Sequence, residues 1–338
     1  MWRMRYFLLI LAVVMGQSVL AADKKPLTKE ESAKVIEAAI RKAAGKPHVV
    51  FVTGDEEYRS EESMPMLARI LKRDFEFEIS IAYSLDDKGF VDPNNTANVT
   101  GIETLKTADL LVLFTRFRNW PDEKFKVFLD YVAQGKPIVG FRTATHAFRY
   151  PTGHKFEAWN EEKIANLVGQ KWITHHGHHG TQILTKVRPL ATAKEHPILR
   201  GVKPFDAYSW LYHVQGGEDK LHGDAMLLAE GTALKSKHLR AKNTKKYPLT
   251  GPTAWVKTYT GTSGKKGRVF FSTTAHSFDF KAATNRKLAL NGILWAMGME
   301  DKIPKDGCSP KLVGKYDPND AGFGAAFKQG LKPAFLPK

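Results

Sequence analysis

The sequence contains almost no cysteine. Its 338 residues include one, Cys308, which lies beyond the last segment with strong helical periodicity. A single cysteine excludes an intramolecular disulfide, and this position leaves no cysteine nucleophile within the predicted core. The folded state must therefore be stabilised by burial of apolar side chains, for which a hydrophobic content of 43% is ample.

Long apolar runs are also scarce. The run Phe7–Met15 follows two arginines and precedes small residues suited to cleavage after Ala21 or Ala22. Because this run is too short to span a bilayer, residues 1–22 are predicted to be a secretory signal peptide, with an uncleaved membrane anchor as the alternative. We therefore expect a periplasmic or secreted protein without stable membrane insertion after cleavage.

Acidic residues are outnumbered, with 35 Asp and Glu against 51 Lys and Arg and a formal net charge of +16. The stretch Lys235–Lys246 carries six of the basic residues and no acidic one. Such a run can contact nucleic acid, an anionic membrane or an acidic polysaccharide, although a solvated loop is commoner. Since no nucleic-acid-binding motif accompanies it and export would separate the protein from intracellular nucleic acid, we expect no nucleic-acid partner.

Four short segments are typical of strands: three are continuous apolar runs, and Phe75–Tyr83 alternates. They cover His48–Thr53, Phe75–Tyr83, Asp109–Thr115 and Pro137–Phe141. Segments with helical spacing of apolar residues separate them, and this succession predicts a parallel sheet with helices on both faces. Because ligands bind at the carboxyl ends of such strands, the loops Gly54–Ser60, Arg116–Asn119 and Arg142–His146 should form one neighbourhood.

The last third of the chain predicts an extension of this sheet. Ala225–Ala229 is typical of a short strand, and Thr253–Tyr259 with Arg268–Thr274 is typical of an antiparallel pair. Asn285–Met297 has the periodicity of an amphipathic helix that ends near Gly298.

The sequence predicts four regions. A signal peptide over 1–22 is followed by a leading helix or linker over 23–46 and by the main domain over 47–300. The tail over 301–338 is rich in Pro, Gly and Lys and lacks periodicity. It is therefore expected to wrap the surface or to be partly disordered.

The densest cluster of candidate ligands is WITHHGHHG at Trp172–Gly180, which contains His175, His176, His178 and His179. Neutral imidazole is a common ligand for transition metals and the usual acid or base near neutral pH. On an extended segment neighbouring side chains point to opposite faces, so at most two of these histidines can readily converge on one point. A solvated His-rich loop is the alternative.

Several longer stretches carry a family resemblance. They are HVVFVTGDEEYRSEES, LFTRFRNWPDE, GKPIVGFRTATHAF, WITHHGHHG, HPILRGV, PTAWVKTY, GRVFFSTT and GILWAMGMEDKIP. Together, over residues 47–315, they resemble the secreted ThuA-like proteins of planctomycete-type bacteria, named for trehalose utilisation. The resemblance implies an α/β fold, a flavodoxin-like three-layer α/β/α sandwich like that of class I glutamine amidotransferases, with a mostly parallel sheet and an antiparallel extension.

The chain departs from the amidotransferases at the turn after the fourth predicted strand. Arg142 stands where those enzymes carry a nucleophilic cysteine, and because an arginine is no nucleophile we expect no amidotransferase activity. Its guanidinium can bind carboxylate, phosphate or sugar hydroxyls, so Arg142 and Thr143 are predicted to bind substrate. A nucleophilic Thr143 or Thr145 with His146 as base is an alternative, as is capping of the next helix.

Catalysis is predicted to depend on His146, His176, His179 and Glu57. Glu57 could act as a general base or hold a histidine tautomer, or it could form an ion pair with Arg116 or Arg142. The predicted substrate-binding residues share a positive charge, a hydroxyl or an imidazole; they are Arg59, Arg116, Arg118, Arg142, Thr143, His175, His178 and His213.

A divalent transition metal is a possible cofactor, with His146, His176, His179 and His276 as its predicted ligands. It would lower the pKa of bound water or polarise a carbonyl, although the spacing is not a recognised zinc pattern. Aromatic residues at Tyr208–Tyr212 would suit sugar rings as stacking surfaces. We therefore expect a hydrolase or lyase that acts on a sugar or an oxidised disaccharide. A non-catalytic carbohydrate-binding or scaffold protein is the alternative, and nothing indicates an oligomeric state.

Overall fold

The computed structural model describes residues 45–177 and 182–336, and the chain from Gly45 onward forms one compact unit. The predicted signal peptide, most of the predicted leading segment, His178 and His179 lie outside the described residues. Within the described ranges, no helix is long and apolar enough to cross a membrane.

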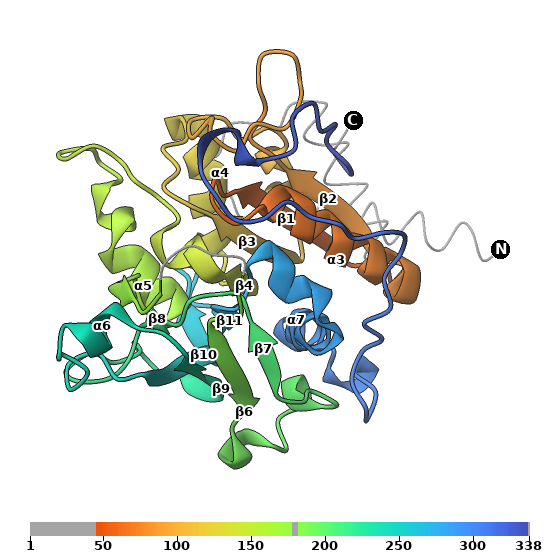
Figure 1. The fold of residues 1–338 in the computed structure, drawn as a ribbon. Helices are drawn as coiled ribbons and strands as arrows, with labels where there is room; N and C mark the ends of the chain where they lie inside the picture. Colours follow the sequence, from red (N-terminus) through yellow and green to blue (C-terminus); the bar gives the residue numbers. More distant parts are fainter. Residues whose placement is uncertain (1–44, 178–181, 337–338) are drawn as a thin grey trace. The chain divides into compact units, whose positions relative to one another are not determined.

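In the described part of the chain, nine strands form one sheet in the order β2-β1-β3-β4-β11-β10-β9-β6-β7 (Figure 1). Their bounds are β1 His48–Gly54, β2 Glu78–Ala82, β3 Leu110–Thr115, β4 Ile138–Phe141, β6 Thr185–Pro189, β7 Phe205–Ala207, β9 Met226–Ala233, β10 Thr250–Thr260 and β11 Lys266–Ser272. Pairing is parallel from β2 to β11 in this order and antiparallel from β11 to β7. The predicted parallel sheet with an antiparallel extension is confirmed.

Helices cover both faces of the sheet, in three layers (Figure 1). One face carries α3 (Ser60–Phe75) and α7 (Ala283–Ala296), and the other carries α4 (Asp122–Ala133) and α5 (Glu162–Val168). The continuous apolar run of β1 serves both layers: Val49 and Phe51 pack in the core beneath α3 and α7, and Val50 and Val52 in the core beneath α4 and α5. This division follows from the strand geometry, in which successive side chains point to opposite faces.

Most predicted elements are present with shifted ends. β2 begins at Glu78 rather than at Phe75, because α3 continues through Phe75. β6 and β7 were not among the predicted strands. In β6, buried residues alternate with exposed polar residues such as Lys186 and Arg188. It therefore lacks the continuous apolar run of the buried strands.

The C-terminal tail wraps the domain over the residues that the structure describes. Its backbone joins the edge of the sheet, where the amide of Ile81 donates to the carbonyl of Phe335 at 3.1 Å. Farther back along the tail, the buried Arg59 donates to the carbonyl of Gly322. These contacts position Phe323 beside the loops at the carboxyl ends of the parallel strands.

Candidate active site

A cleft of about 1030 Å³ opens beside the loops that follow β1, β3 and β4. Further lining comes from two short strands, β5 (Thr174–His175) and β8 (Tyr212–His213), which pair with each other. The lining residues are Glu56, Glu57, Tyr58, Thr96, Arg116, Phe117, Asn119, His146, Arg149, Trp172, His175, Trp210, Tyr212 and Phe323. Each of the three loops predicted to form one neighbourhood contributes to this list, so that prediction is confirmed.

The cleft has a buried floor and an exposed rim. Tyr58, His146 and Tyr212 are buried and form part of the floor. Arg149 and Phe323 are exposed and stand at the rim, where 52% of Phe323 remains accessible. A bound ligand would therefore contact desolvated groups at one end and solvent-facing groups at the other.

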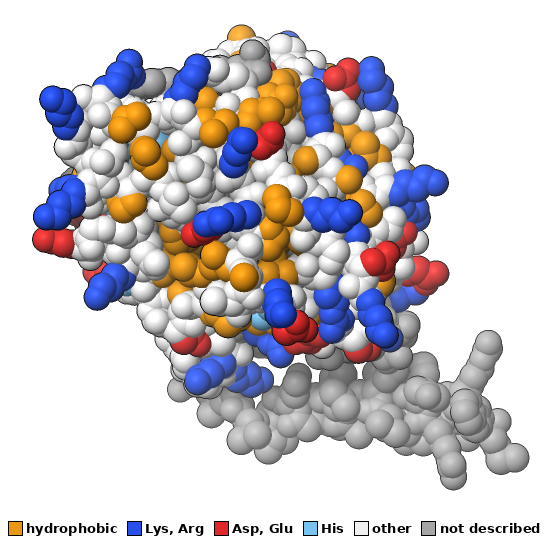
Figure 2. All heavy atoms as spheres, turned by 60° about the horizontal axis from the view of Figure 1, so that its bottom comes forward, with side chains coloured by type: hydrophobic (Ala, Val, Ile, Leu, Met, Phe, Trp, Pro, Cys, Tyr) orange, Lys and Arg blue, Asp and Glu red, His pale blue; other side chains and the backbone are white. Residues whose placement is uncertain are grey.

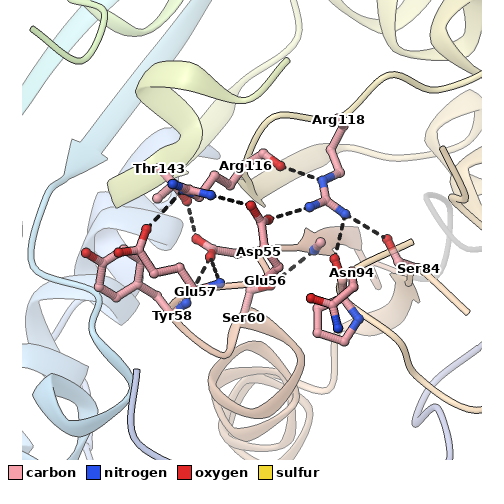
Figure 3. A network of polar contacts seen from close by, with 12 residues as sticks. Asp55, Glu56, Glu57, Tyr58, Ser60, Ser84, Asn94, Arg116, Arg118 and Thr143 are labelled. Carbon is pink, nitrogen blue, oxygen red and sulfur yellow. Dashed lines mark hydrogen bonds and ion pairs between the residues drawn. The ribbon is translucent and has the colours of Figure 1, made fainter. Parts of the chain in front are cut away.

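Two carboxylates form ion pairs with the arginines that follow β3 (Figure 3). Glu56 pairs with both Arg116 and Arg118, and Glu57 Oε2 lies 3.0 Å from Arg116 Nε. The ion pair predicted as one alternative for Glu57 is therefore the arrangement in the structure. Arg118 is fully buried, so it does not line the cleft as predicted; it donates to the carbonyl of Pro93 at 2.9 Å and supports Glu56 from behind.

Asp55 is a buried residue that holds the loop after β1 through hydrogen bonds (Figure 3). Its Oδ1 accepts hydrogen bonds from the backbone amides of Glu57 and Tyr58 at 2.7 and 2.8 Å. Its Oδ2 accepts from the hydroxyl of Thr143, which is itself fully buried. Burial, followed by the charges of Glu56 and Glu57, raises the pKa of Asp55 above the ordinary carboxyl value. Thr143 thus holds this loop and does not line the cleft, unlike the prediction that it binds substrate.

Arg142 lies behind the floor of the cleft rather than in it. Its guanidinium carbon is 4.0 Å from the ring centroid of Tyr58 and 4.4 Å from that of Tyr212. It donates to the carbonyls of Trp210 and Thr273 at 3.3 and 3.0 Å. Because the side chain is fully buried and both terminal nitrogens donate within the domain, Arg142 orders two cleft-lining phenols and is not placed to bind substrate as predicted.

The hydrogen bonds of His146 define its tautomer. The hydroxyl of Thr145 donates to the carbonyl of Arg142 at 3.1 Å, so at 3.0 Å from His146 Nδ1 it can only accept. Nδ1 therefore carries the proton and Nε2 keeps a lone pair. Burial, followed by the charges of Arg116, Arg142 and Arg149, lowers the pKa of His146 well below its ordinary value. The alternative in which His146 activates Thr145 stays a prediction, and the hydroxyl of Thr145 is fully buried outside the cleft lining.

His175 presents a second neutral imidazole to the same cleft. Its Nδ1 lies 3.0 Å from the carbonyl of Gly177, which can only accept, so Nε2 again keeps the lone pair. The ring stacks on Trp172 with centroids 5.8 Å apart, and it contacts Trp210 at 4.4 Å. Burial, followed by the charge of Lys237, lowers the pKa of His175 to about 3.

This low pKa predicts a loss of stability in acid. The unfolded chain binds a proton at position 175 below a pH of about 6.5, whereas the folded chain does not until about pH 3, so the free energy of unfolding falls as the pH falls through this window. In urea titrations across that window, His175→Asn should show a shallower dependence of unfolding free energy on pH than the wild type. The exposed His222→Asn is the control, and an unchanged slope in His175→Asn would contradict the assignment.

The described histidines of the predicted metal set have separate surroundings. His146 is at the cleft, whereas His176 binds Ser236 Oγ through Nδ1 at 2.8 Å and lines a different groove. His276 Nε2 lies 3.2 Å from Asp320. Among the described residues, no group of three His, Cys, Asp or Glu is arranged to hold a metal ion. His179 lies outside them, as does His178.

Two further predicted substrate-binding residues do not line the cleft. Arg59 is fully buried and donates to the carbonyls of Glu56 and Gly322, which attaches the tail to the loop after β1. His213 is buried and its Nε2 lies 2.9 Å from Asp219 Oδ2. Arg59 lies in the loop after β1 and His213 ends β8, but both side chains are buried inside the domain.

Several lining residues were not predicted. Phe117 and Arg149 stack on each other, with the guanidinium carbon 3.5 Å from the ring centroid. Trp172 was noted only as the start of the histidine cluster, and Phe323 belongs to a tail without periodicity. Their aromatic or cationic character was visible in the sequence, but nothing local indicated that they face the same cleft.

Comparisons with known proteins place the chain in a family. Among curated proteins, none matches it. A solved ThuA-like protein from Parabacteroides merdae is 17% identical, with a TM-score of 0.47 over 84% of this chain and 100% of that one. Another from Bacteroides uniformis is 15% identical, with a TM-score of 0.46 over 74% of this chain and 91% of that one. Residues 48–296 match the ThuA family, described as trehalose utilisation, and since this match spans most of the chain, the protein belongs to that family.

Proposed function

We propose that this chain is an exported, carbohydrate-active enzyme that cleaves an oxidised disaccharide, with His146 as the general base. The observation that carries the proposal is the neutral imidazole at the floor of the cleft, whose Nε2 lone pair is fixed by the hydrogen bond from Nδ1 to Thr145. A base that is unprotonated at neutral pH and held in one tautomer is what proton abstraction requires.

The walls of the cleft support a carbohydrate ligand. Trp172 is half-buried and Phe323 at the rim is exposed, and sugar rings can stack on such aromatic surfaces; Trp210 and Tyr212 line the cleft but are buried. Beside them, the two imidazole Nε2 atoms of His146 and His175 can accept hydrogen bonds from sugar hydroxyls. The volume of about 1030 Å³ leaves space for more than one ring.

The charged groups favour an elimination over the usual glycosidase mechanism. Glycosidases of the common type need one free carboxylate and one protonated carboxyl on either side of the scissile bond. Glu56 and Glu57 are instead held by Arg116, and Asp55 is buried outside the cleft lining. The guanidinium of Arg149 stands at the rim and can stabilise a developing oxyanion.

The proposed step is a β-elimination. His146 Nε2 takes a proton from the carbon between the sugar carbonyl and the glycosidic carbon, and the carbonyl oxygen gains the negative charge of an enolate. The enolate re-forms the carbonyl and a carbon–carbon double bond while the glycosidic C–O bond breaks. The departing oxygen takes the proton from the His146 imidazolium, so the base is regenerated and the products are an unsaturated keto sugar and a free sugar.

A matched pair of substrates tests this function. One is a disaccharide that carries a carbonyl two carbons from its glycosidic carbon, and the other is the parent disaccharide with a hydroxyl at that position. We expect turnover of the oxidised compound alone, with the ultraviolet absorbance of a conjugated ketone. Equal turnover of both compounds would contradict an elimination and favour hydrolysis.

The second candidate is a non-catalytic carbohydrate-binding protein. It is favoured by the low pKa of His146, since burial and the nearby arginines make this imidazole a weak base in the free protein. Calorimetric binding of both disaccharides without turnover of either would identify this function. The charge of an enolate would compensate the arginines during reaction, which is why we place the enzyme first.

A further inference from the structure

A second groove, which shares no lining residue with the cleft, lies at the basic stretch Lys235–Lys246. It has a volume of about 450 Å³, and it contains the short helix α6 (Lys237–Arg240) in its wall. Its lining residues are His176, Gly177, Gln182, Leu184, Leu234, Lys235, Ser236, Lys237, Leu239 and Arg240. We refer to this groove together with the adjoining Ile183 as the Leu234–Leu239 patch.

Large aliphatic side chains of this patch face solvent. The exposed fractions are 40% for Ile183, 46% for Leu234 and 59% for Leu239. Leu234 and Leu239 both line the groove, and Ile183 lies between two lining residues, Gln182 and Leu184. Single exposed leucines are ordinary, but two exposed leucines in one groove, with an exposed isoleucine next to its lining, form an apolar patch of the kind that marks an interaction site.

Basic side chains surround these aliphatic residues. Lys235 and Arg240 are exposed and Lys237 is half-buried, and none of the described residues that line the groove is acidic. Figure 2 shows a face of the molecule on which apolar side chains lie among Lys and Arg side chains, with Asp and Glu interspersed. The exposed Lys242 and Lys245 continue the positive charge along the same stretch.

We propose that the Leu234–Leu239 patch binds an anionic lipid surface, with the leucines inserted among the acyl chains and the lysines and arginine against the headgroups. Charge complementarity selects an anionic partner, since each basic side chain near such a surface contributes to binding. The exposed aliphatic side chains then distinguish a membrane from an acidic polysaccharide, because a polysaccharide has no apolar phase into which a leucine could transfer. This attachment is peripheral and does not depend on the proposed catalytic function.

Vesicle sedimentation tests the proposal on the protein purified after processing of its predicted leader. We expect the wild type to bind vesicles of phosphatidylcholine with phosphatidylglycerol at least about tenfold more strongly than vesicles of phosphatidylcholine alone, and to release them as salt is raised. The double variant Leu234→Ser/Leu239→Ser should weaken binding to the anionic vesicles by about tenfold or more. Lys235→Glu/Arg240→Glu should weaken it by a similar factor of at least about ten.

Matched controls lie outside the patch. Val313→Ser removes another exposed aliphatic side chain, and Lys265→Glu/Lys266→Glu reverses two exposed charges at the β10–β11 turn. Both should bind as the wild type does.

A second readout does not depend on loss of binding. Leu239→Trp places a reporter at the most exposed leucine of the patch, and its fluorescence should shift to shorter wavelength when anionic vesicles are added. Wild-type affinity of Leu234→Ser/Leu239→Ser for the vesicles would overturn the proposal. Retention of the wild type on a sulfated polysaccharide without binding to vesicles would also overturn it.

Discussion

His146→Gln is expected to lower kcat on the oxidised disaccharide by about 10²- to 10⁴-fold, the usual contribution of a general base. Glutamine keeps a polar side chain at the floor of the cleft but cannot accept the proton. KM should change by only a few fold, because the aromatic walls and His175 remain in place. Steady-state kinetics on purified variants measures both constants, and the exposed His222→Gln provides the matched control.

The pH profile separates a base from a residue that only shapes the cleft. Since burial and nearby arginines lower the pKa of His146, wild-type kcat/KM should not fall as the pH is lowered from 8 to about 6.5, and the fall should come at lower pH. Arg149→Gln removes one of the charges that lower this pKa, so it should move the fall to higher pH. A kcat in His146→Gln within a few fold of the wild-type value would contradict the assignment.

Arg142→Met is expected to reduce the free energy of unfolding by about 2–5 kcal/mol, because two buried carbonyls lose their donor at a cost of about 1–3 kcal/mol each. Methionine fills part of the volume but donates no hydrogen bonds, so the carbonyls of Trp210 and Thr273 would remain buried without their donor. The phenols of Tyr58 and Tyr212 would also lose the cation between them.

Urea unfolding followed by tryptophan fluorescence measures this effect. Arg149→Met is the matched control, since the same substitution at an exposed arginine of the same cleft should change stability by no more than about 1 kcal/mol, the contribution of its contact with Phe117. Arg142→Lys keeps the charge but not the planar fork, so its loss should fall between the two. A loss below about 1 kcal/mol in Arg142→Met would show that the guanidinium does not stabilise the fold as described.

The sequence was sufficient for the architecture because strand burial leaves a strong local pattern. β1, β3 and β4 are continuous apolar runs followed at once by polar residues, so both their existence and their carboxyl ends could be predicted. Those ends in turn indicated which loops meet at the cleft. Strands at the antiparallel edge of the sheet were harder, as β6 shows, because half of their side chains are polar and face solvent.

The direction of individual side chains could not be predicted in the same way. Arg116, Arg118 and Arg142 all follow a parallel strand, yet only Arg116 lines the cleft. Arg142 is drawn inward by acceptors on segments far away in the sequence, at Trp210 and Thr273. Its backbone also adopts φ of +40°, which is uncommon for a residue other than glycine, and no local sequence pattern predicts this conformation.

In the histidine cluster, His175 lines the cleft as predicted, whereas its neighbour His176 does not. The expectation that neighbouring histidines point to opposite faces is confirmed for the described pair, because His175 lines the cleft and His176 lines the groove of the Leu234–Leu239 patch. Which of the two would face the cleft depended on the pairing of β5 with β8, a contact between distant segments.

The tail that carries Phe323 makes completion of the cleft a late step of folding. The carbonyl of Gly322, which accepts from Arg59, lies 263 residues farther along the chain. Contacts of such long sequence separation form slowly, because a large loop must close before they stabilise the fold. The strands β1 to β4, which all lie in the first half of the chain, can therefore pair earlier, whereas the rim at Phe323 closes only once the tail has docked.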